Sequence, residues 1–464
     1  MKRAILVTTG LALVALSIVL ALLSSQYTYG GAPLARPTLQ FVALMMLAGA
    51  AYLVAVALVV HSRGFVQCHL AYVLLIGAAM RAAWFASTPI LEDDFYRYLW
   101  DGGLVANGHN SFAYTPNDLR GADAPAALRA LAVASGDVFS RVNHPQYGTI
   151  YPPVAQAVFA LAHLIHPWSL LAWRAVLLSF DGATLALLFL LLRQLGLPQV
   201  WLLIYWWNPL LVKETVNSAH MDVLALPSVL GALWFVLRHR ASAASVLLAI
   251  AAAIKVWPLA LVPLMGRFGD LSRRRVTITL SVLGVAAAIL VAPMHPVLHL
   301  GEPSGFIAYG KSWEMNDTLF MGLLVAAEVM AGVIGWDSNG SANTIARIFL
   351  ALLLAAWMLR LCWTRAKSGE SLCDRIALFL AAALLVGPTF FPWYYAWMLP
   401  FLALRPRASL LILTAMLPLY YLKFHFDARG NVNVFHQQLV WLEFAPTFAL
   451  LAWEWFHARK KSPA

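Results

Sequence analysis

Apolar segments long enough to cross a lipid bilayer recur along the whole chain. The runs at 4–23, 38–60, 69–90 and 168–192 each hold about 20 residues or slightly more, the length at which an α-helix spans the hydrocarbon core. Hydrophobic residues make up 61% of the 464 positions and charged residues only 11%, which is typical of membrane proteins and not of soluble multidomain proteins. We therefore predict an all-α polytopic membrane protein, a single domain over 1–464 with about 12–14 transmembrane helices.

Basic residues gather in short clusters between the apolar runs. Clusters such as 238–240, 273–275 and 405–407 hold many of the 32 Lys and Arg and few of the 21 Asp and Glu. The positive-inside rule then predicts that these clusters and both termini are cytoplasmic. The net charge of +11 is thus interpreted as membrane topology. Because the clusters lack the aromatic interleaving of a nucleic-acid surface, we predict the lipid bilayer as a partner and no nucleic acid.

The cysteines are scattered and predict no disulfide framework. Cys68, Cys362 and Cys373 all fall beside segments that we assign to the cytoplasmic face, and their spacing matches no metal site. No metal centre and no cofactor are predicted, and dependence on a divalent metal is left open.

Residues 91–167 form the longest stretch without a convincing span. They separate N-terminal spans in 1–90 from the remaining helical bundle in 168–464. Loops of this length in compact proteins are usually functional or disordered, and the aromatic residues and prolines here argue against disorder. We predict an ordered extracytoplasmic loop that carries surface helices.

Two adjacent carboxylates, Asp93 and Asp94, follow directly after an apolar run at the start of this loop. If the next residues form a helix, Asp94, Arg97, Tyr98 and Asp101 share one face of it. Such a helix is expected to lie on the membrane surface with its polar face toward water. A helix N-cap is the structural alternative for the two acids, although two acids beside Arg97 exceed what a cap requires.

Other polar clusters fall on the same predicted side of the membrane as these acids. They are the segments 144–151, 214–222, 311–317 and 393–397, together with Lys255. Carboxylates beside lone cations and aromatic rings suit a sugar bound next to an anionic leaving group. A carboxylate can accept the proton of an attacking hydroxyl, and cations can stabilise charge on a departing phosphate.

Each cluster also has a purely structural interpretation. Glu214, His220 and Asp222 can form a hydrogen-bond network that contacts no ligand, and one His with two carboxylates at loose spacing is a weak metal signal. Lys255 can extend toward the membrane interface. The aromatic residues of 393–397 can form an interfacial belt.

The apolar run at 243–262 is interrupted near its centre by Lys255 and Pro258. Basic residues at both ends of the run predict two half-helices that enter from one side and return, with Lys255 at the tip.

Several of these segments resemble bacterial GT-C glycosyltransferases, most closely the polyprenyl-phosphate-mannose-dependent mannosyltransferases of the α-1,6-mannosyltransferase and family 87 groups. The first loop carries the most specific part of the likeness, namely DDFYRYLWDG at 93–102, VANGHN at 105–110, AYTP at 113–116 and TIYPP at 149–153. Weaker motifs follow in the expected order: Trp207-Asn-Pro209 with Glu214, His220-Met-Asp222, Lys255 with Pro258, Trp313 with Asn316, and PWYYAW at 392–397.

The resemblance implies a GT-C-like bundle in a bacterial inner membrane with its active site outside the cytoplasm. It implies a polyprenyl-phosphate sugar donor, and it assigns the catalytic base to Asp94, with Asp93 as the alternative in the doubled acid. Lys255 is the expected contact to the donor phosphate, and Arg97 and Lys311 are candidates to assist it. The remaining predicted substrate contacts are Tyr96, Tyr98, Asp101, His144, Tyr151, Glu214, His220, Asp222, Trp313, Asn316, Tyr394 and Tyr395.

The favoured hypothesis is an inverting transfer of a sugar, mannose by resemblance, to a hydroxyl of a glycan or glycolipid acceptor. A retaining route needs a carboxylate nucleophile, and the sequence singles none out. The alternative from another class is a transporter or flippase of lipid-linked sugars, because broken helices with polar residues at depth are also transporter features.

Overall fold

The computed structural model describes residues 1–61, 70–121, 123–268, 273–295, 305–333 and 341–461. Most of these residues are helical, and within them no strand forms beyond one isolated bridge between Met315 and Thr389. The predicted all-α class is confirmed. Cys362 and Cys373 are free thiols, and Cys68 lies outside the described residues.

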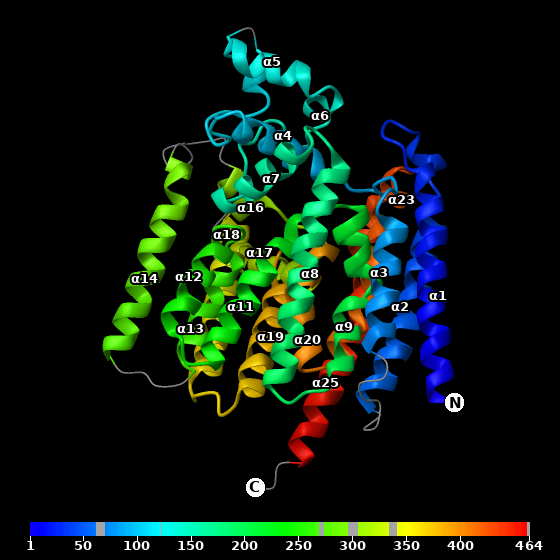
Figure 1. Ribbon diagram of the computed structural model, residues 1–464, viewed down its shortest axis with the longest axis vertical. Helices are drawn as coiled ribbons and strands as arrows, with labels where there is room; N and C mark the ends of the chain where they lie inside the picture. The colour runs from blue at the N-terminus through cyan, green and yellow to red at the C-terminus, as the bar shows by residue number, and fades with distance from the viewer. Residues whose placement is uncertain (62–69, 122, 269–272, 296–304, 334–340, 462–464) are drawn as a thin grey trace.

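Three helices at the N-terminus lie side by side at one edge of the bundle (Figure 1). They are α1 (Lys2–Leu23), α2 (Thr38–His61) and α3 (Leu70–Trp84). A compact cap of short helices then covers one end of the bundle (Figure 1). Its helices are α4 (Phe95–Ala106), α5 (Ala126–Ala134), α6 (Asp137–Ser140) and α7 (Pro153–Ile165).

The rest of the chain forms the bundle beneath this cap. Its helices are α8 (Leu170–Gln194), α9 (Leu202–Trp206), α10 (Pro209–Val212), α11 (Leu226–Leu237), α12 (Ala241–Ala252), α13 (Val262–Gly266), α14 (Arg273–Val291), α16 (Gly305–Ser312), α17 (Leu319–Val333), α18 (Ser341–Cys362), α19 (Gly369–Val386), α20 (Leu399–Leu404), α21 (Ala408–Leu411), α22 (Leu413–Met416), α23 (Leu422–Asp427), α24 (Val432–Val434) and α25 (Val440–Lys461). Short 3₁₀ and π turns join several of them.

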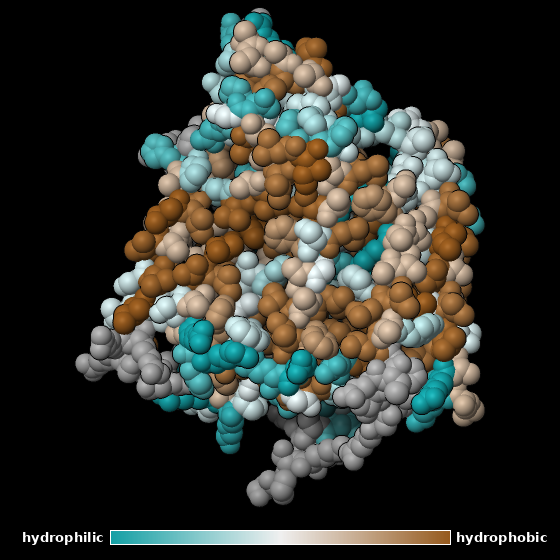
Figure 2. Space-filling view, viewed as in Figure 1, coloured by the Kyte–Doolittle hydropathy of each residue, from teal (hydrophilic) through white to brown (hydrophobic). Residues whose placement is uncertain are grey.

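The surface carries a broad hydrophobic band across the middle of the molecule, with hydrophilic residues above and below it (Figure 2). Leu22 and Leu75 are 70% and 68% exposed, and a contiguous band of such apolar side chains is typical of a surface that faces lipid tails. Six helical segments of the described residues are long and apolar enough to cross a membrane, or seven if one pair bent by 102° counts as a span. The protein is an integral membrane protein.

Shorter or broken helices cover other parts of the chain, some of them where spans were predicted and one of them, Pro153–Ile165, within the predicted loop. Five apolar helices of 10 to 17 residues occur in the described part: Leu70–Trp84, Pro153–Ile165, Ala241–Ala252, Trp257–Gly266 and Leu319–Val333. The predicted interruption of 243–262 is confirmed, because α12 ends at Ala252, a 3₁₀ turn runs over Trp257–Leu261, and α13 follows. Lys255 lies between the two half-helices.

Helix α4 forms where the sequence pattern predicts it, but its polar face does not point toward water. Arg97 is 6% exposed and Asp101 is 1% exposed, because α4 packs along α7. The Gln156 amide of α7 donates a hydrogen bond to Asp101 at 3.1 Å. A Cβ atom at Gly102 would lie 2.4 Å from the carbonyl oxygen of Phe159, so the absence of a side chain there permits the close approach of the two helices.

Within the bundle, Arg81 of α3 forms a structural ion pair. Its Nε lies 2.5 Å from Asp181 Oδ2, and its Nη1 donates to the carbonyl oxygen of Trp206 at 2.7 Å. The guanidinium also lies 3.4 Å from the centre of the Trp206 ring. A charge buried in the bundle interior is tolerated because it is paired and hydrogen-bonded in this way. This interaction ties α3 to α8 and α9.

Candidate active site

A cavity of about 960 Å³ opens between the cap and the bundle. Segments from all parts of the chain reach it: 88–98, 143–152, 254–257, 391–397 and 420–424, with further residues from 27–36 and 305–315. Aromatic side chains make up much of its wall. Such a wall suits the faces of sugar rings and an isoprenoid chain, while a few polar groups provide orientation.

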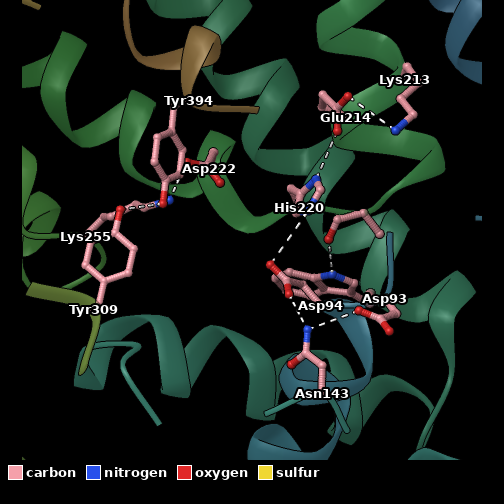
Figure 3. A network of polar contacts seen from close by, with 12 residues as sticks. Asp93, Asp94, Asn143, Lys213, Glu214, His220, Asp222, Lys255, Tyr309 and Tyr394 are labelled. Atoms are coloured by element: carbon pink, nitrogen blue, oxygen red, sulfur yellow. Dashed lines mark hydrogen bonds and ion pairs between the residues drawn. The ribbon is translucent and has the colours of Figure 1, made fainter. Parts of the chain in front are cut away.

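Asp93 and Asp94 lie on this cavity wall, held by one amide. The Asn143 Nδ2 donates to Asp94 Oδ1 at 2.6 Å and lies 3.1 Å from Asp93 Oδ1 (Figure 3). Asp94 occupies the N-cap position of α4, yet its side chain makes no capping hydrogen bond. The Asp94 carboxylate is therefore directed to the cavity and to Asn143, and an N-cap alone does not account for it.

Burial and mutual repulsion make the first acid of the pair unusual. Burial raises the pKa of Asp93 to about 6, and the negative charge of Asp94 adds to this rise, whereas the hydrogen bond from Asn143 opposes it. Burial also holds the pKa of the preceding Glu92 well above its ordinary value. Asp93 thus takes up a proton at a higher pH than an ordinary aspartate, although it is mostly ionised at neutral pH.

His220 lies behind Asp94, with Nε2 3.8 Å from Asp94 Oδ2 (Figure 3). Its ring stacks on Trp393 at a centroid distance of 3.9 Å. Its Nδ1 lies 3.1 Å from Glu214 Oε2. His220 and Glu214 are fully buried and are not among the cavity-lining residues, so the structure places them in a supporting layer behind the cavity wall.

A second polar pair lies on the wall near the break between the half-helices. Lys255 Nζ lies 2.5 Å from Asp222 Oδ1, and the Trp397 indole Nε1 donates to the same oxygen at 2.5 Å. The ammonium group also lies 4.5 Å from the centre of the Tyr394 ring. Asp222 Oδ2 is buried without a hydrogen-bond partner, and both residues line the cavity. This oxygen can therefore accept a hydrogen bond from a ligand hydroxyl.

The structure brings most of the predicted site residues to this one cavity. Those that line it are Asp93, Asp94, Tyr96, Arg97, Tyr98, His144, Tyr151, Asp222, Lys255, Trp313 and Tyr394. The Arg97 guanidinium is already engaged, since Nη2 donates to the carbonyl oxygens of His144 and Tyr147 at 3.2 and 2.9 Å. Arg97 thus holds the 143–152 segment in place. The Lys311 side chain lies outside the described part of the structure.

Other predicted contacts lie away from the cavity wall. Asp101 bonds with Gln156, as described above. Asn316 donates to the carbonyl oxygen of Phe390 and to Glu443, both at 2.9 Å. Tyr395 donates to the carbonyl oxygen of Leu410 at 3.2 Å. These side chains have protein partners, and none of them is among the residues that line the cavity.

The cavity also contains residues that the sequence did not single out. Asn143, Arg36, Trp257, Tyr309 and Lys423 all line it. Asn143 directly precedes a predicted segment and could have been included on that basis. Arg36 and Lys423 carry no local signal, because only the tertiary fold brings the two ends of the chain together there. Within the described residues, no group of three or more His, Cys, Asp or Glu side chains is arranged to hold a metal ion.

Two comparisons with known families match this chain. The family model described as the N-terminal domain of alpha-(1->6)-mannopyranosyltransferase matches residues 4–268, and the model of glycosyltransferase family 87 matches residues 149–392. No individual curated protein and no solved structure matches the chain significantly. Each family model covers more than half of the chain, and together they span residues 4–392, which include most of the cavity-lining residues; those at 393–424 lie beyond the matched range. The protein therefore belongs to the α-(1→6)-mannopyranosyltransferase family and to glycosyltransferase family 87, and it is a membrane-embedded glycosyltransferase.

Proposed function

We propose that the protein transfers mannose from a polyprenyl-phosphate donor to a hydroxyl of a glycan or glycolipid acceptor on the extracytoplasmic side of the membrane. The observation that supports this most directly is that Asp94 and Lys255 line one aromatic cavity. A base can deprotonate the acceptor hydroxyl, and a cation in the same cavity can stabilise the negative charge of the departing phosphate.

In this reaction Asp94 acts as the general base. It accepts the proton of the acceptor hydroxyl as the oxygen attacks the anomeric carbon, and the bond to the donor phosphate breaks with its electron pair on the phosphate. A single displacement of this kind inverts the anomeric configuration. Asp94 is favoured over Asp93 because its motif position matches the base of the resembling enzymes, because Asn143 holds it more closely, at 2.6 Å against 3.1 Å, and because it faces His220 at 3.8 Å.

Lys255 is proposed to stabilise the departing phosphate. An ammonium group has three N–H donors, and Asp222 accepts from Lys255 Nζ at 2.5 Å. The remaining donors can reach an anion in the cavity, and the Lys255 side chain is 20% exposed there. Tyr394 and Trp397 flank the ammonium and reduce its hydration, which strengthens its attraction to a phosphate.

The test uses the purified protein with a radiolabelled polyprenyl-phosphate mannose and membrane extract as the acceptor source. Asp94→Asn keeps the size of the side chain and should abolish release of label from the carrier, with donor binding retained. Asp93→Asn is the matched control and should retain most of the turnover. Unchanged turnover in both variants would eliminate the proposed mechanism. The anomeric configuration of the product, read by NMR, separates inversion from retention.

A further inference from the structure

A continuous chain of polar contacts leads from Asp94 into the interior of the bundle. It passes through His220 to Glu214, whose Oε1 accepts a hydrogen bond from the Tyr421 hydroxyl. Lys213 Nζ also donates to the Tyr421 hydroxyl and lies 3.3 Å from Glu214 Oε1. The residues of this chain behind Asp94 are buried, and Figure 3 shows Glu214 on the far side of His220 from Asp94, with Lys213 beside Glu214.

An irregular backbone segment creates this alignment. Residues Lys213–Asn217 form a π-helical turn, and the amide of His220 donates to the carbonyl oxygen of Glu214 at 2.9 Å. Ala219 adopts φ +58°, in the left-handed region that β-carbons disfavour. The turn thereby folds His220 back over Glu214, six residues earlier. π turns and residues with strained backbone concentrate at functional sites. Both occur here within seven residues, which favours a functional role for this segment.

The contacts of Glu214 fix which nitrogen of His220 carries the proton. Glu214 Oε1 accepts from Tyr421 and lies beside the Lys213 ammonium, which stabilises the ionised carboxylate. An ionised carboxylate only accepts hydrogen bonds, so the hydrogen between Glu214 Oε2 and His220 belongs to Nδ1. A ring that carries its single proton on Nδ1 has its lone pair on Nε2. This atom is buried without a hydrogen-bond partner and faces Asp94.

Resting on the function proposed above, we propose that Glu214 is a positioning residue: it fixes the His220 tautomer whose Nε2 receives the proton that Asp94 removes from the acceptor hydroxyl. Lys213 and Tyr421 in turn keep Glu214 ionised and in place. Glu214 therefore acts on the reaction only through His220.

The steps balance as follows in atoms and charge. The acceptor O–H bond breaks, its proton goes to Asp94 Oδ2, and the oxygen bonds to the anomeric carbon while the phosphate leaves with the electron pair. The proton then moves from Asp94 to His220 Nε2, which restores the Asp94 carboxylate. The imidazolium is held between the carboxylates of Asp94 and Glu214, and after the products leave the proton returns through Asp94 to water in the cavity. The 3.8 Å separation of Nε2 and Oδ2 must shorten by about 1 Å for this transfer.

The groups around the His220 ring are compatible with a transient positive charge. Asp94 and Glu214 face its two nitrogens, and the Trp393 ring covers one of its faces. Lys213 lies behind Glu214 and neutralises that carboxylate in the resting state. Carboxylates on both sides of the ring thus stabilise a positive charge when the ring receives the proton.

The experiment compares Glu214→Gln with Asp181→Asn, a second buried carboxylate that pairs with Arg81 and is not among the cavity-lining residues. Glu214→Gln should lower kcat at least about tenfold and change the pH profile of kcat, with little change in the KM for the donor. Asp181→Asn should lower thermal stability while leaving kcat per folded enzyme and its pH profile unchanged. If both variants lose only stability, Glu214 is structural and the proposal fails. If Glu214→Gln does not fold, Tyr421→Phe removes one contact of Glu214 and should lower kcat in the same direction.

Chemical rescue provides a second readout that packing alone would not produce. His220→Ala leaves a ring-sized space beneath Trp393. Added imidazole should restore turnover, whereas pyrazole, a ring of the same size but a much weaker base, should not. Equal rescue by both rings would show that His220 only fills space. If Asp94→Asn is inactive while Glu214→Gln and His220→Gln react at the normal rate, the proposed function stands and only the positioning role fails.

Discussion

Lys255 and Asp222 form an ion pair, with Nζ 2.5 Å from Oδ1, on the wall of the same cavity that holds Asp94. The pair comes from two irregular turns, the break between α12 and α13 and the 3₁₀ turn Met221–Ala225. Both turns interrupt regular helices, and both place a charged side chain on the cavity wall. The pair can therefore serve the two polar parts of a glycosyl phosphate, with the cation toward the phosphate and the free Asp222 Oδ2 toward a sugar hydroxyl.

Replacing Lys255 separates its role in binding from its role in folding. Lys255→Met should raise the donor KM about thirtyfold, because a charge-assisted contact to phosphate contributes about 2 kcal/mol. It should also lower stability, since Asp222 loses its ion-pair partner. The double variant Lys255→Met with Asp222→Asn should recover stability without recovering donor affinity. An unchanged donor KM in Lys255→Met, measured at saturating acceptor, would contradict the assignment.

The raised pKa of Asp93 predicts that the effect of Asp93→Asn on the free energy of unfolding depends on pH. The value rises from 3.8 to about 6 on folding, so the folded state holds the proton more tightly. The stability that this provides is present at low pH and is lost as pH rises between about 4 and 6. Asp93→Asn should therefore stabilise the protein at about pH 7.5 by about 1–3 kcal/mol and leave it nearly unchanged at about pH 4. Thermal unfolding in detergent at both pH values measures this, and equal shifts at the two pH values would be inconsistent with it.

Asn143 should control the same ionisation through its amide. Its hydrogen bond opposes the rise in the pKa of Asp93, and it contacts Asp94 at 2.6 Å. Asn143→Ala should raise the pKa of Asp93 above about 6 and lower turnover, because Asp94 loses the group that orients it. The loss of turnover should persist at alkaline pH, where Asp93 is ionised with or without the amide, because it comes from the lost orientation of Asp94. Unchanged turnover in Asn143→Ala would show that the amide only fills space.

The sequence predicted local elements well where a short pattern determines them. The helix after Asp94 follows from its periodicity, and the break at Lys255 follows from Pro258 with basic residues on both sides. The water-facing orientation of α4 was wrong, because the partner that buries Asp101 is Gln156, 55 positions later. Burial of a polar face depends on such distant partners, which periodicity does not report.

The supporting layer of the site was beyond sequence-based prediction for a related reason. Glu214 carries the same motif signal whether it faces a ligand or stands behind His220. Only the π turn at Lys213–Asn217 decides between these positions. Lys423 and Arg36 reach the cavity because the two ends of the chain meet there, and no local pattern encodes that meeting.

Membrane sidedness can be tested with a matched pair of cysteines in a background that lacks the natural ones. Val133 of α5 is 82% exposed on the cap, and Lys367 is exposed near the first turn of α19, within a basic segment. If the cavity opens outside the cytoplasm, a membrane-impermeant maleimide should label Val133→Cys in intact cells and Lys367→Cys only after lysis. The reverse pattern would place the cavity on the cytoplasmic side and would remove the proposed location of the reaction.

The contact between α4 and α7 positions Asp94, so it should be sensitive to a single added carbon atom. A Cβ at Gly102 would lie 2.4 Å from the carbonyl oxygen of Phe159, a backbone atom that cannot move aside without shifting α7. Gly102→Ala should therefore lower stability by about 1–3 kcal/mol and reduce turnover, because α7 and the start of α4 move apart. Gly182→Ala in α8 is the matched control, since no atom lies within 4 Å of its added Cβ, and alanine there should be neutral or slightly stabilising. Thermal unfolding and turnover of the two variants measure the difference, and equal stability would mean that α4 and α7 do not pack as closely as the structure describes.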